Sequence, residues 1–155
     1  MALPPGYSIH PGMPTLETYM YLRKSTGLTP PSTAQAAASI QGAWYGCHVV
    51  YTPENRDNNK TSPETVAMGR VVGDGGWYFV IADMAVSTDH QRKGLGDAIL
   101  KHLLHKINST APSEPGFPPF INLLADPPGR KLYERNGFAY TAPRSLGMLY
   151  KGPTT

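Results

Sequence analysis

The segment from Trp77 to Ile107 constrains the fold more than any other part of the chain. An apolar run ending in Ile81-Ala-Asp-Met-Ala-Val86 has strand composition, and a basic, glycine-rich turn, Gln91 to Gly96, separates it from a run with helical spacing. Because Gly94 and Gly96 lack a Cβ atom, an anion can approach the backbone N–H groups at the helix start, where the helix dipole also favours negative charge. The sequence therefore predicts a site for an anionic cofactor.

The length and charge of the chain limit its function. Its 155 residues suit one domain, predicted to span 1–155. The net charge of +3 comes from 14 basic and 11 acidic residues without long Lys/Arg runs, which disfavours nucleic acid as a partner. Cys47 is the only cysteine, so no internal disulfide can form. With neither a secretory signal nor an apolar run of membrane-spanning length, we expect a cytoplasmic protein with no membrane partner.

The remaining pattern predicts an alternation of strands and helices. Helices are expected from the capping residue Thr15 to near Gly27, after Pro31 to about Ile40 with Ser32 or Thr33 as cap, from 95 to 107 and from 129 to 136. Strands are expected at 7–9, 45–51, 66–72, 77–86 and 120–125, with a final hairpin of 138–141 and 146–151. Strands 77–86 and 120–125 flank a helix, so they should be parallel or splayed neighbours.

Three segments together carry a family resemblance. The glycine-rich turn alone is weak evidence, because Gln-x-x-Gly-x-Gly is neither a Walker loop nor a dinucleotide motif. Combined with Asp83-Met-Ala-Val86 before it and Leu132-Tyr-Glu-Arg-Asn-Gly-Phe138 after it, the turn resembles the GNAT superfamily of acetyl-CoA dependent N-acetyltransferases. The resemblance is strong over residues 65 to 151. It implies an α/β fold: a mixed, mostly antiparallel twisted sheet of six or seven strands, helices on both faces, and a cofactor cleft between the fourth and fifth strands.

The resemblance also implies which residues bind acetyl-CoA. The amides of the turn, from Gln91 and Arg92 through Lys93, Gly94 and Leu95 to Gly96, would bind the coenzyme A diphosphate, with Arg92 and Lys93 adding positive charge. In similar proteins a bulge splays the preceding strand, which would leave Met84, Ala85 and Val86 to pair with the pantetheine amides. Asp126 replaces an asparagine that contacts the cofactor in many members, and a carboxylate there can accept a hydrogen bond from an amide but cannot donate one.

Two residues are predicted to be catalytic. Tyr133 matches the family tyrosine, whose hydroxyl would protonate the departing thiolate after direct attack by a neutral amine. Similar enzymes often carry a base at the positions of Val80 or Ala82, and neither residue here can accept a proton. Asp83 aligns with an acidic residue of some members, although strand alternation would turn it away from Ala82 unless a bulge re-aims it. Glu17, His48 and water remain alternatives for the base.

The acceptor stays open at the level of sequence. The preferred reading is acetylation of a small-molecule primary amine; the alternatives are acetylation of a protein N-terminus or lysine, and a non-catalytic acyl-CoA sensor. Homodimers are common in similar proteins, but no apolar stripe here specifies an interface. His102 and His105 are spaced for metal binding, yet they lie on a polar helix side without a third ligand, so no metal is expected. Arg70, inside a strand, is expected to have a carboxylate partner.

Overall fold

A computed structural model describes residues 3–53 and 62–152 of the chain. The contacts divide it into two compact units, Met1–Leu123 and Leu124–Thr155. The first unit contains, in order, β1 (Tyr7–Pro11), α1 (Leu16–Ser25), α2 (Thr33–Gln41), β2 (Tyr45–Tyr51), β3 (Glu64–Gly73), β4 (Tyr78–Val86), a single 3-10 turn (Thr88–His90), α3 (Leu95–Thr110) and β5 (Phe120–Asn122). The second unit contains a 3-10 turn (Pro127–Gly129) and α4 (Arg130–Arg135). The prediction of one domain over 1–155 stays a prediction.

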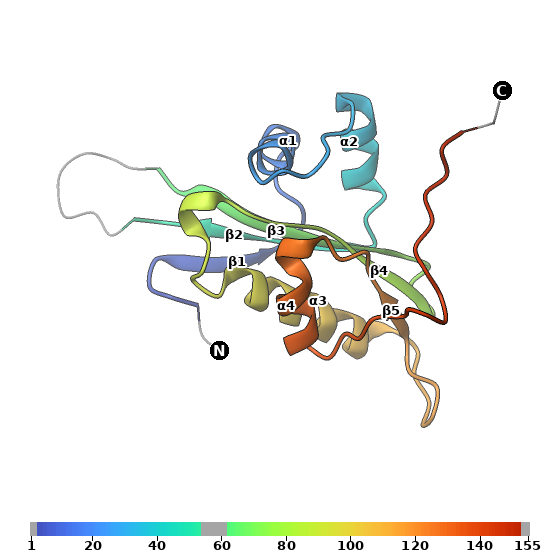
Figure 1. The fold of residues 1–155 in the computed structure, drawn as a ribbon. Helices are drawn as coiled ribbons and strands as arrows, with labels where there is room; N and C mark the ends of the chain where they lie inside the picture. Colours follow the sequence, from blue (N-terminus) through green and yellow to red (C-terminus); the bar gives the residue numbers. More distant parts are fainter. Residues whose placement is uncertain (1–2, 54–61, 153–155) are drawn as a thin grey trace. The chain divides into compact units, whose positions relative to one another are not determined.

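The first unit is a mixed sheet with helices on both faces, as the sequence predicted. The strand order is β1-β2-β3-β4-β5; the first four strands are antiparallel neighbours, and β5 is parallel to β4. Helices α1 and α2 cover one face, and α3, which connects β4 to β5, covers the other (Figure 1). The crossover through α3 explains why β4 and β5 run in the same direction.

Local capping explains where the first two helices begin. The Thr15 side chain accepts a hydrogen bond from the N–H of Thr18 at 3.3 Å, and Ser32 forms a reciprocal capping box with Gln35. Gly27, with a φ of +83°, follows the end of α1. The predicted caps at Thr15 and Ser32 are confirmed. In each case the side-chain hydroxyl oxygen accepts a hydrogen bond from a backbone amide that has no partner inside the helix.

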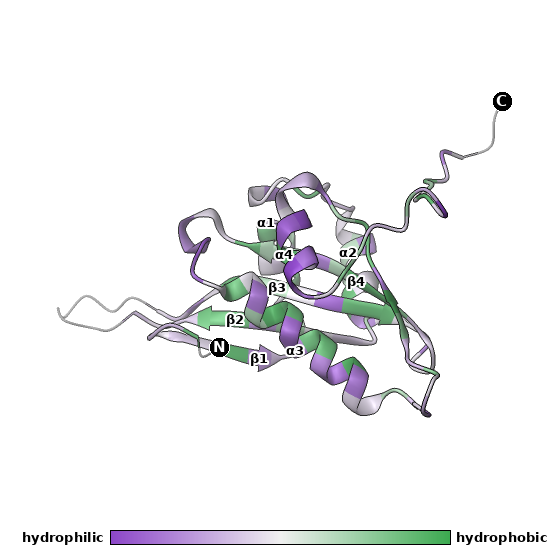
Figure 2. Ribbon diagram, turned by 60° about the horizontal axis from the view of Figure 1, so that its bottom comes forward, coloured by the Kyte–Doolittle hydropathy of each residue, from purple (hydrophilic) through white to green (hydrophobic). Residues whose placement is uncertain are grey.

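The core has a layer on each side of the sheet. On one side α3 buries a stripe at helical spacing, and Figure 2 shows the hydrophobic and hydrophilic residues alternating along this helix. The stripe consists of Leu95, Ile99, Leu100, Leu103 and Ile107. The other layer joins α1 and α2 to the sheet through Tyr19, Leu22, Ala36, Met68 and Ala85. Both layers meet β3 and β4, so these two strands are fixed from both sides.

Within residues 3–53 and 62–152 the sheet has five strands, so the prediction of six or seven was wrong. The hairpin expected at 138–141 and 146–151 is not formed: Thr141 and Ser145 close a local turn through a Ser145 N–H to Thr141 C=O bond of 3.1 Å, and no strand follows within the described residues. Leu146, Met148 and Tyr150 remain exposed. Alternating apolar residues do not make a strand unless a neighbouring strand accepts the backbone hydrogen bonds.

Candidate active site

The centre of the candidate site is a β-bulge in β4. Met68 pairs with Ala85 and Arg70 pairs with Ala82, so the single residue Gly69 of β3 lies opposite two residues, Asp83 and Met84. Asp83 adopts a φ of +55°, the left-handed conformation that relieves the insertion of an extra residue. The bulge that the family resemblance implied is therefore present in β4, immediately before Met84, Ala85 and Val86.

Gly69 makes the bulge compatible with the packing of α3. A Cβ atom at Gly69 would lie 2.6 Å from Cγ2 of Ile99, 2.7 Å from Sδ of Met84 and 3.2 Å from Cδ1 of Leu103. Carbon atoms in contact normally lie ~3.5–4.0 Å apart, so no side chain fits there without movement of its neighbours. The absence of a side chain at Gly69 thus lets α3 pack directly over the bulge.

The extra residue changes which backbone groups face the edge beside β5. Just before β4, the carbonyl of Trp77 accepts a hydrogen bond from the N–H of Phe120 at 2.8 Å. In the first part of β4 the backbone N–H and C=O groups of the odd-numbered residues therefore point toward β5. After the bulge the N–H of Ser87 donates to the carbonyl of Val66 in β3 at 2.8 Å. Because backbone groups alternate between the two edges of a strand, those of Met84 and Val86 now point toward the β5 edge. Strand β5 pairs only with Tyr78–Val80.

The bulge turns the Asp83 side chain toward α1. Its carboxylate accepts a hydrogen bond from the Tyr19 hydroxyl at 2.7 Å and forms ion pairs with Nη1 of Arg23 and Nε of Arg70. Arg70 also donates to the Ser39 carbonyl of α2 and pairs with Ala82 across the strands, so Asp83 and Ala82 lie on the same sheet face. The carboxylate partner predicted for Arg70 is thus confirmed. The predicted catalytic role of Asp83 stays a prediction.

This ion-pair cluster is nearly closed to solvent. The Asp83 side chain is 6% exposed, and the Arg23 and Arg70 side chains are 16% and 14% exposed. Burial, followed by the hydrogen bond to Asp83, raises the pKa of Tyr19, which keeps its hydroxyl a donor to the carboxylate. Sequence reasoning missed Tyr19 and Arg23 as partners of Asp83, although their spacing of four residues on a helix places them on one face.

The turn after β4 leads directly into the start of α3. The Gln91 side chain donates to the Val86 carbonyl at 3.0 Å, and Arg92 has a φ of +60°. Gly94 caps α3 with a φ of +81°, and a Cβ atom built on it would meet no atom within 4 Å. The first N–H groups of a helix have no partner inside the helix and carry the positive end of its dipole. The turn residues Gln91 to Gly94 are therefore exposed, and they lead directly to the positively polarised start of α3.

Lys93 is held above this turn by neighbours that the sequence did not suggest. Its Nζ donates to the Tyr7 hydroxyl at 3.0 Å and to the Asp89 carbonyl at 3.2 Å. The Tyr7 hydroxyl in turn bonds Nδ1 of His90 at 2.8 Å. Tyr7 lies in β1, more than 80 residues before Lys93, and no motif links the two positions, so sequence alone carried no signal for this contact.

Tyr133 and Asp126 belong to the second unit, in which α4 is followed by a glycine, Gly137. The rings of Tyr133 and Phe138 meet edge to face with centroids 5.9 Å apart, and the Phe138 N–H donates to the Tyr133 carbonyl at 3.1 Å. Gly137, with a φ of +88°, follows the helix as predicted. Burial, and secondarily the charge of Asp126, raise the pKa of Tyr133, so its hydroxyl holds its proton over a wider pH range than an ordinary tyrosine.

The other candidates lie elsewhere in the first unit. His48 of β2 hydrogen-bonds the Gly12 carbonyl through Nδ1 at 2.8 Å, and Glu17 lies in the first turn of α1. His102 hydrogen-bonds the Tyr45 hydroxyl at 2.8 Å, and burial lowers its pKa. Over residues 3–53 and 62–152, no group of three or more His, Cys, Asp or Glu side chains is arranged to bind a metal. No helix in the same ranges is long and apolar enough to cross a membrane.

Comparison with known proteins agrees with this geometry. Residues 41–140 match the family model of the GNAT acetyltransferase domain. In structure, the chain is similar to a protein from meticillin-resistant Staphylococcus aureus, described as a probable acetyltransferase of unknown function, with a TM-score of 0.78 and 30% identity over 94% of this chain and 99% of that one. No curated protein sequence matches the chain.

Two more distant structures share the fold. A GNAT-family acetyltransferase from Streptococcus pneumoniae has a TM-score of 0.70 at 18% identity, covering 96% of this chain and 99% of that chain. The ribosomal-protein-S18-alanine N-acetyltransferase from Escherichia coli has a TM-score of 0.58 at 20% identity, covering 84% of this chain and 76% of that chain. With the family model covering most of the chain, the protein belongs to the GNAT family of acetyltransferases and is an acyltransferase. GNAT domains use acetyl-CoA as co-substrate.

Proposed function

We propose that this protein transfers the acetyl group of acetyl-CoA to a primary amine of a small molecule. The observation that carries the proposal is the bulge of β4 followed directly by the open, positive-φ Gly94 at the start of α3. The bulge supplies backbone groups on the β5 edge of β4, and the helix start supplies N–H groups and positive charge. A cofactor that carries both a thioester arm and a diphosphate needs both features, and here they follow one another along the chain.

The residues of the turn fit the diphosphate. The amides from Gln91 to Gly96 are proposed to bind it, with the side chains of Arg92 and Lys93 adding charge, and no side chain at Gly94 blocks the approach. Met84, Ala85 and Val86 are proposed to pair with the pantetheine arm in a cleft between β4 and β5, since the backbone of Met84 and Val86 points to that edge. Asp126 is proposed to accept a hydrogen bond from a pantetheine amide.

The chemistry proposed is direct transfer without a covalent enzyme intermediate. The nitrogen of a neutral amine attacks the thioester carbonyl, a C–N bond forms, and the C–S bond breaks. A backbone N–H on the β5 edge of β4 is proposed to stabilise the oxyanion, and Tyr133 to protonate the departing thiolate. A primary amine is mostly protonated at neutral pH, so a base must take its proton. The two ion pairs of Asp83 disfavour it as this base and favour His48, Glu17 or a water chain.

Two alternative functions remain to be tested against this one. The Escherichia coli protein that shares the fold acetylates a ribosomal protein, so peptides with a free N-terminus or lysine belong in any substrate panel. The apolar residues Val80 and Ala82, at positions where similar enzymes often carry a base, favour a sensor that binds acyl-CoA without turnover. A cytoplasmic location and a homodimer are kept as predictions, and sedimentation velocity tests the second.

The test combines binding and turnover. Calorimetry is expected to show binding of CoA and acetyl-CoA by the wild type, a large loss of affinity for Gly94→Val, and no loss for Gly116→Val, whose φ of +86° and open surroundings match those of Gly94. Thiol release is then followed with polyamines, arylalkylamines, aminosugars, amino acids and peptides. Turnover of small amines supports the proposal, turnover of peptides alone replaces it with the protein acceptor, and tight binding without turnover replaces it with the sensor.

A further inference from the structure

We propose that Tyr7, His90 and Glu64 form a positioning chain that fixes the ammonium group of Lys93 for a phosphate of the cofactor. The inference rests on the proposed function, because it assigns a role to residues around the diphosphate turn. The three residues come from β1, the 3-10 turn after β4, and β3. None of them is in the glycine-rich motif, and none is expected to touch the cofactor.

The positioning chain runs without a break from the carboxylate of Glu64 to the ammonium group of Lys93. Oε1 of Glu64 lies 3.1 Å from Nε2 of His90, Nδ1 of His90 lies 2.8 Å from the Tyr7 hydroxyl, and that hydroxyl lies 3.0 Å from Nζ of Lys93. All three separations are within hydrogen-bond range. Because Lys93 lies three residues after the 3-10 turn Thr88–His90 and directly precedes Gly94, the positioning chain ends at the helix start where the diphosphate is proposed to bind.

Elementary chemistry fixes the direction of the bond from Lys93, and the proposal assigns the directions of the other two. The ammonium of Lys93 can only donate, so the Tyr7 oxygen accepts from it. The single proton of the Tyr7 hydroxyl is then free to be donated to Nδ1 of His90, which makes Nδ1 an acceptor. A neutral His90 with an acceptor at Nδ1 carries its proton at Nε2, where it donates to the Glu64 carboxylate. The proposed chain therefore uses one arrangement of His90, with a proton on Nε2 and none on Nδ1.

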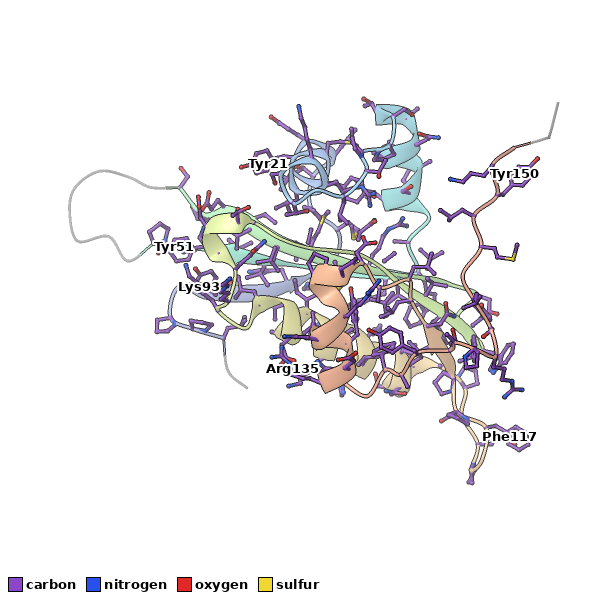
Figure 3. All side chains as sticks on the ribbon, viewed as in Figure 1. Tyr21, Tyr51, Lys93, Phe117, Arg135 and Tyr150 are labelled. Carbon is purple, nitrogen blue, oxygen red and sulfur yellow. The ribbon has the colours of Figure 1, made fainter. Side chains whose placement is uncertain are left out.

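Aromatic packing holds the chain in this geometry. The rings of Tyr7 and Tyr51 have centroids 4.7 Å apart, those of Tyr51 and His90 are 5.1 Å apart, and Nζ of Lys93 lies 5.6 Å from the centroid of the Tyr7 ring. Tyr51, at the end of β2, and Lys93 both lie near the Tyr7 ring, and Figure 3 labels them at this end of the sheet. Among the residues that the structure describes, the charged and titratable groups in contact with His90 or with its hydrogen-bond partners are Tyr7, Tyr51, Glu64 and Lys93, with Asp89 beside it in sequence.

A fixed lysine is more useful to a phosphate than a mobile one. An exposed lysine loses rotamer entropy of up to ~2 kcal/mol when it is immobilised, which cancels much of a surface ion pair. Here that entropy is lost in the folded protein, before any anion binds. Among the described residues, the Tyr7 hydroxyl and the Asp89 carbonyl accept two of the three N–H groups of Lys93, which leaves the third for a phosphate oxygen.

The test is a double-mutant cycle on CoA affinity. Tyr7→Phe removes the hydroxyl and keeps the ring, and Lys93→Met removes the charge. Calorimetry is expected to show weaker binding of CoA by about tenfold for Lys93→Met and by about threefold to tenfold for Tyr7→Phe, but less than about twofold for Tyr7→Phe in the Lys93→Met background. Glu64→Gln is expected to act in the same direction more weakly, and because the Glu64 side chain is 59% exposed, this substitution leaves the core packing unchanged. Tyr21→Phe, at an exposed tyrosine of α1, is the control without effect.

Each outcome separates this inference from the proposed function. If the wild type binds CoA and Gly94→Val does not, but Tyr7→Phe weakens binding equally with and without Lys93, then Tyr7 is only structural and the inference is wrong. If the wild type binds no CoA, the proposed function fails first. The ¹⁵N shifts of His90 give a readout independent of activity: a protonated Nε2 with an unprotonated Nδ1 is expected, and the opposite tautomer would overturn the chain.

Discussion

Tyr133 is the residue whose proposed role a kinetic experiment tests most directly. Burial and Asp126 both raise the pKa of Tyr133, so its proton stays in place above the ordinary tyrosine range near ~10. We predict that Tyr133→Phe lowers kcat by about 10²-fold or more while the Kd for CoA changes little, because a general acid acts only after binding. Tyr140→Phe, at an exposed tyrosine of the same unit, is the matched control.

The pH profile supplies a second readout for the same residue. As pH rises through the raised pKa of Tyr133, the acid is lost, so the alkaline fall of kcat should lie above the range of an unperturbed tyrosine and should be absent from Tyr133→Phe. A phenylalanine variant that loses affinity and turnover in equal measure would contradict the assignment as acid.

Asp83 offers a test of whether a catalytic or a structural role dominates. Asp83→Asn keeps a residue that tolerates positive φ but removes the charge between two guanidinium groups. We predict a loss of about 3 kcal/mol in the free energy of unfolding, because the Arg23 and Arg70 charges stay buried without their partner. Chemical denaturation measures it, with Glu114→Gln, an exposed acid, as control. Unchanged stability together with lost turnover would instead favour catalysis.

At the scale of elements, the contact between β3, β4 and α3 depends on Gly69. We predict that Gly69→Ala destabilises the protein by about 1–3 kcal/mol, because the new methyl group would overlap Ile99 and Met84. Gly76→Ala is the control, since the nearest atom to its Cβ lies at 3.7 Å. Combining Gly69→Ala with Ile99→Ala should cost less than the sum of the two single changes. Strict additivity in thermal denaturation would show that Gly69 is not limited by α3.

Elements with local signals could be predicted from sequence. The strand Tyr45–Tyr51 agrees residue for residue, and α1 and α2 begin at the caps that hydroxyl side chains provide. The final hairpin was wrong because pairing depends on a neighbouring strand and not on alternation. Strand β5 ends at Asn122, earlier than the predicted Ala125, for the same reason: its apolar composition continues, but its pairing with β4 does not.

The candidate site could likewise be predicted only in part. The residues proposed to bind the cofactor between Met84 and Gly96 are contiguous in sequence, so the family resemblance identifies them. The partners of Asp83 and Lys93 come from α1, β1 and β3, and only tertiary structure places them. Contacts between residues this far apart leave no periodicity in a single sequence.

For the molecule as a whole, stability at alkaline pH is linked to Cys47. Burial in the sheet raises the pKa of its thiol to about 12, against ~8.5 in an unfolded chain. The folded state thus keeps a proton that the unfolded state loses. This contribution to stability is complete below the unfolded pKa, and it declines as pH rises toward the folded pKa.

We therefore predict a steeper alkaline loss of stability for the wild type than for Cys47→Ala. Between pH 9 and about 10.5 the wild type should lose up to ~2 kcal/mol more of its free energy of unfolding than Cys47→Ala does, as measured by denaturation in urea. At pH 8 the folded thiol, which is 0% exposed, should react with a disulfide reagent only as fast as the protein opens. Rapid labelling under native conditions would contradict the burial of Cys47.

The extra residue in β4 has a consequence for how this protein can diverge or be redesigned. The two halves of the strand follow opposite alternation rules, joined at Asp83 and Met84. Substitutions within either half alter one side chain at a time. Deleting a single residue at the junction would restore a regular ladder in which Ala85 still pairs with Met68, so every later side chain would keep its face while the bulge and the positive φ of Asp83 would be lost. The extra residue therefore serves the bulge alone, and it could be removed without changing which later side chains face the core.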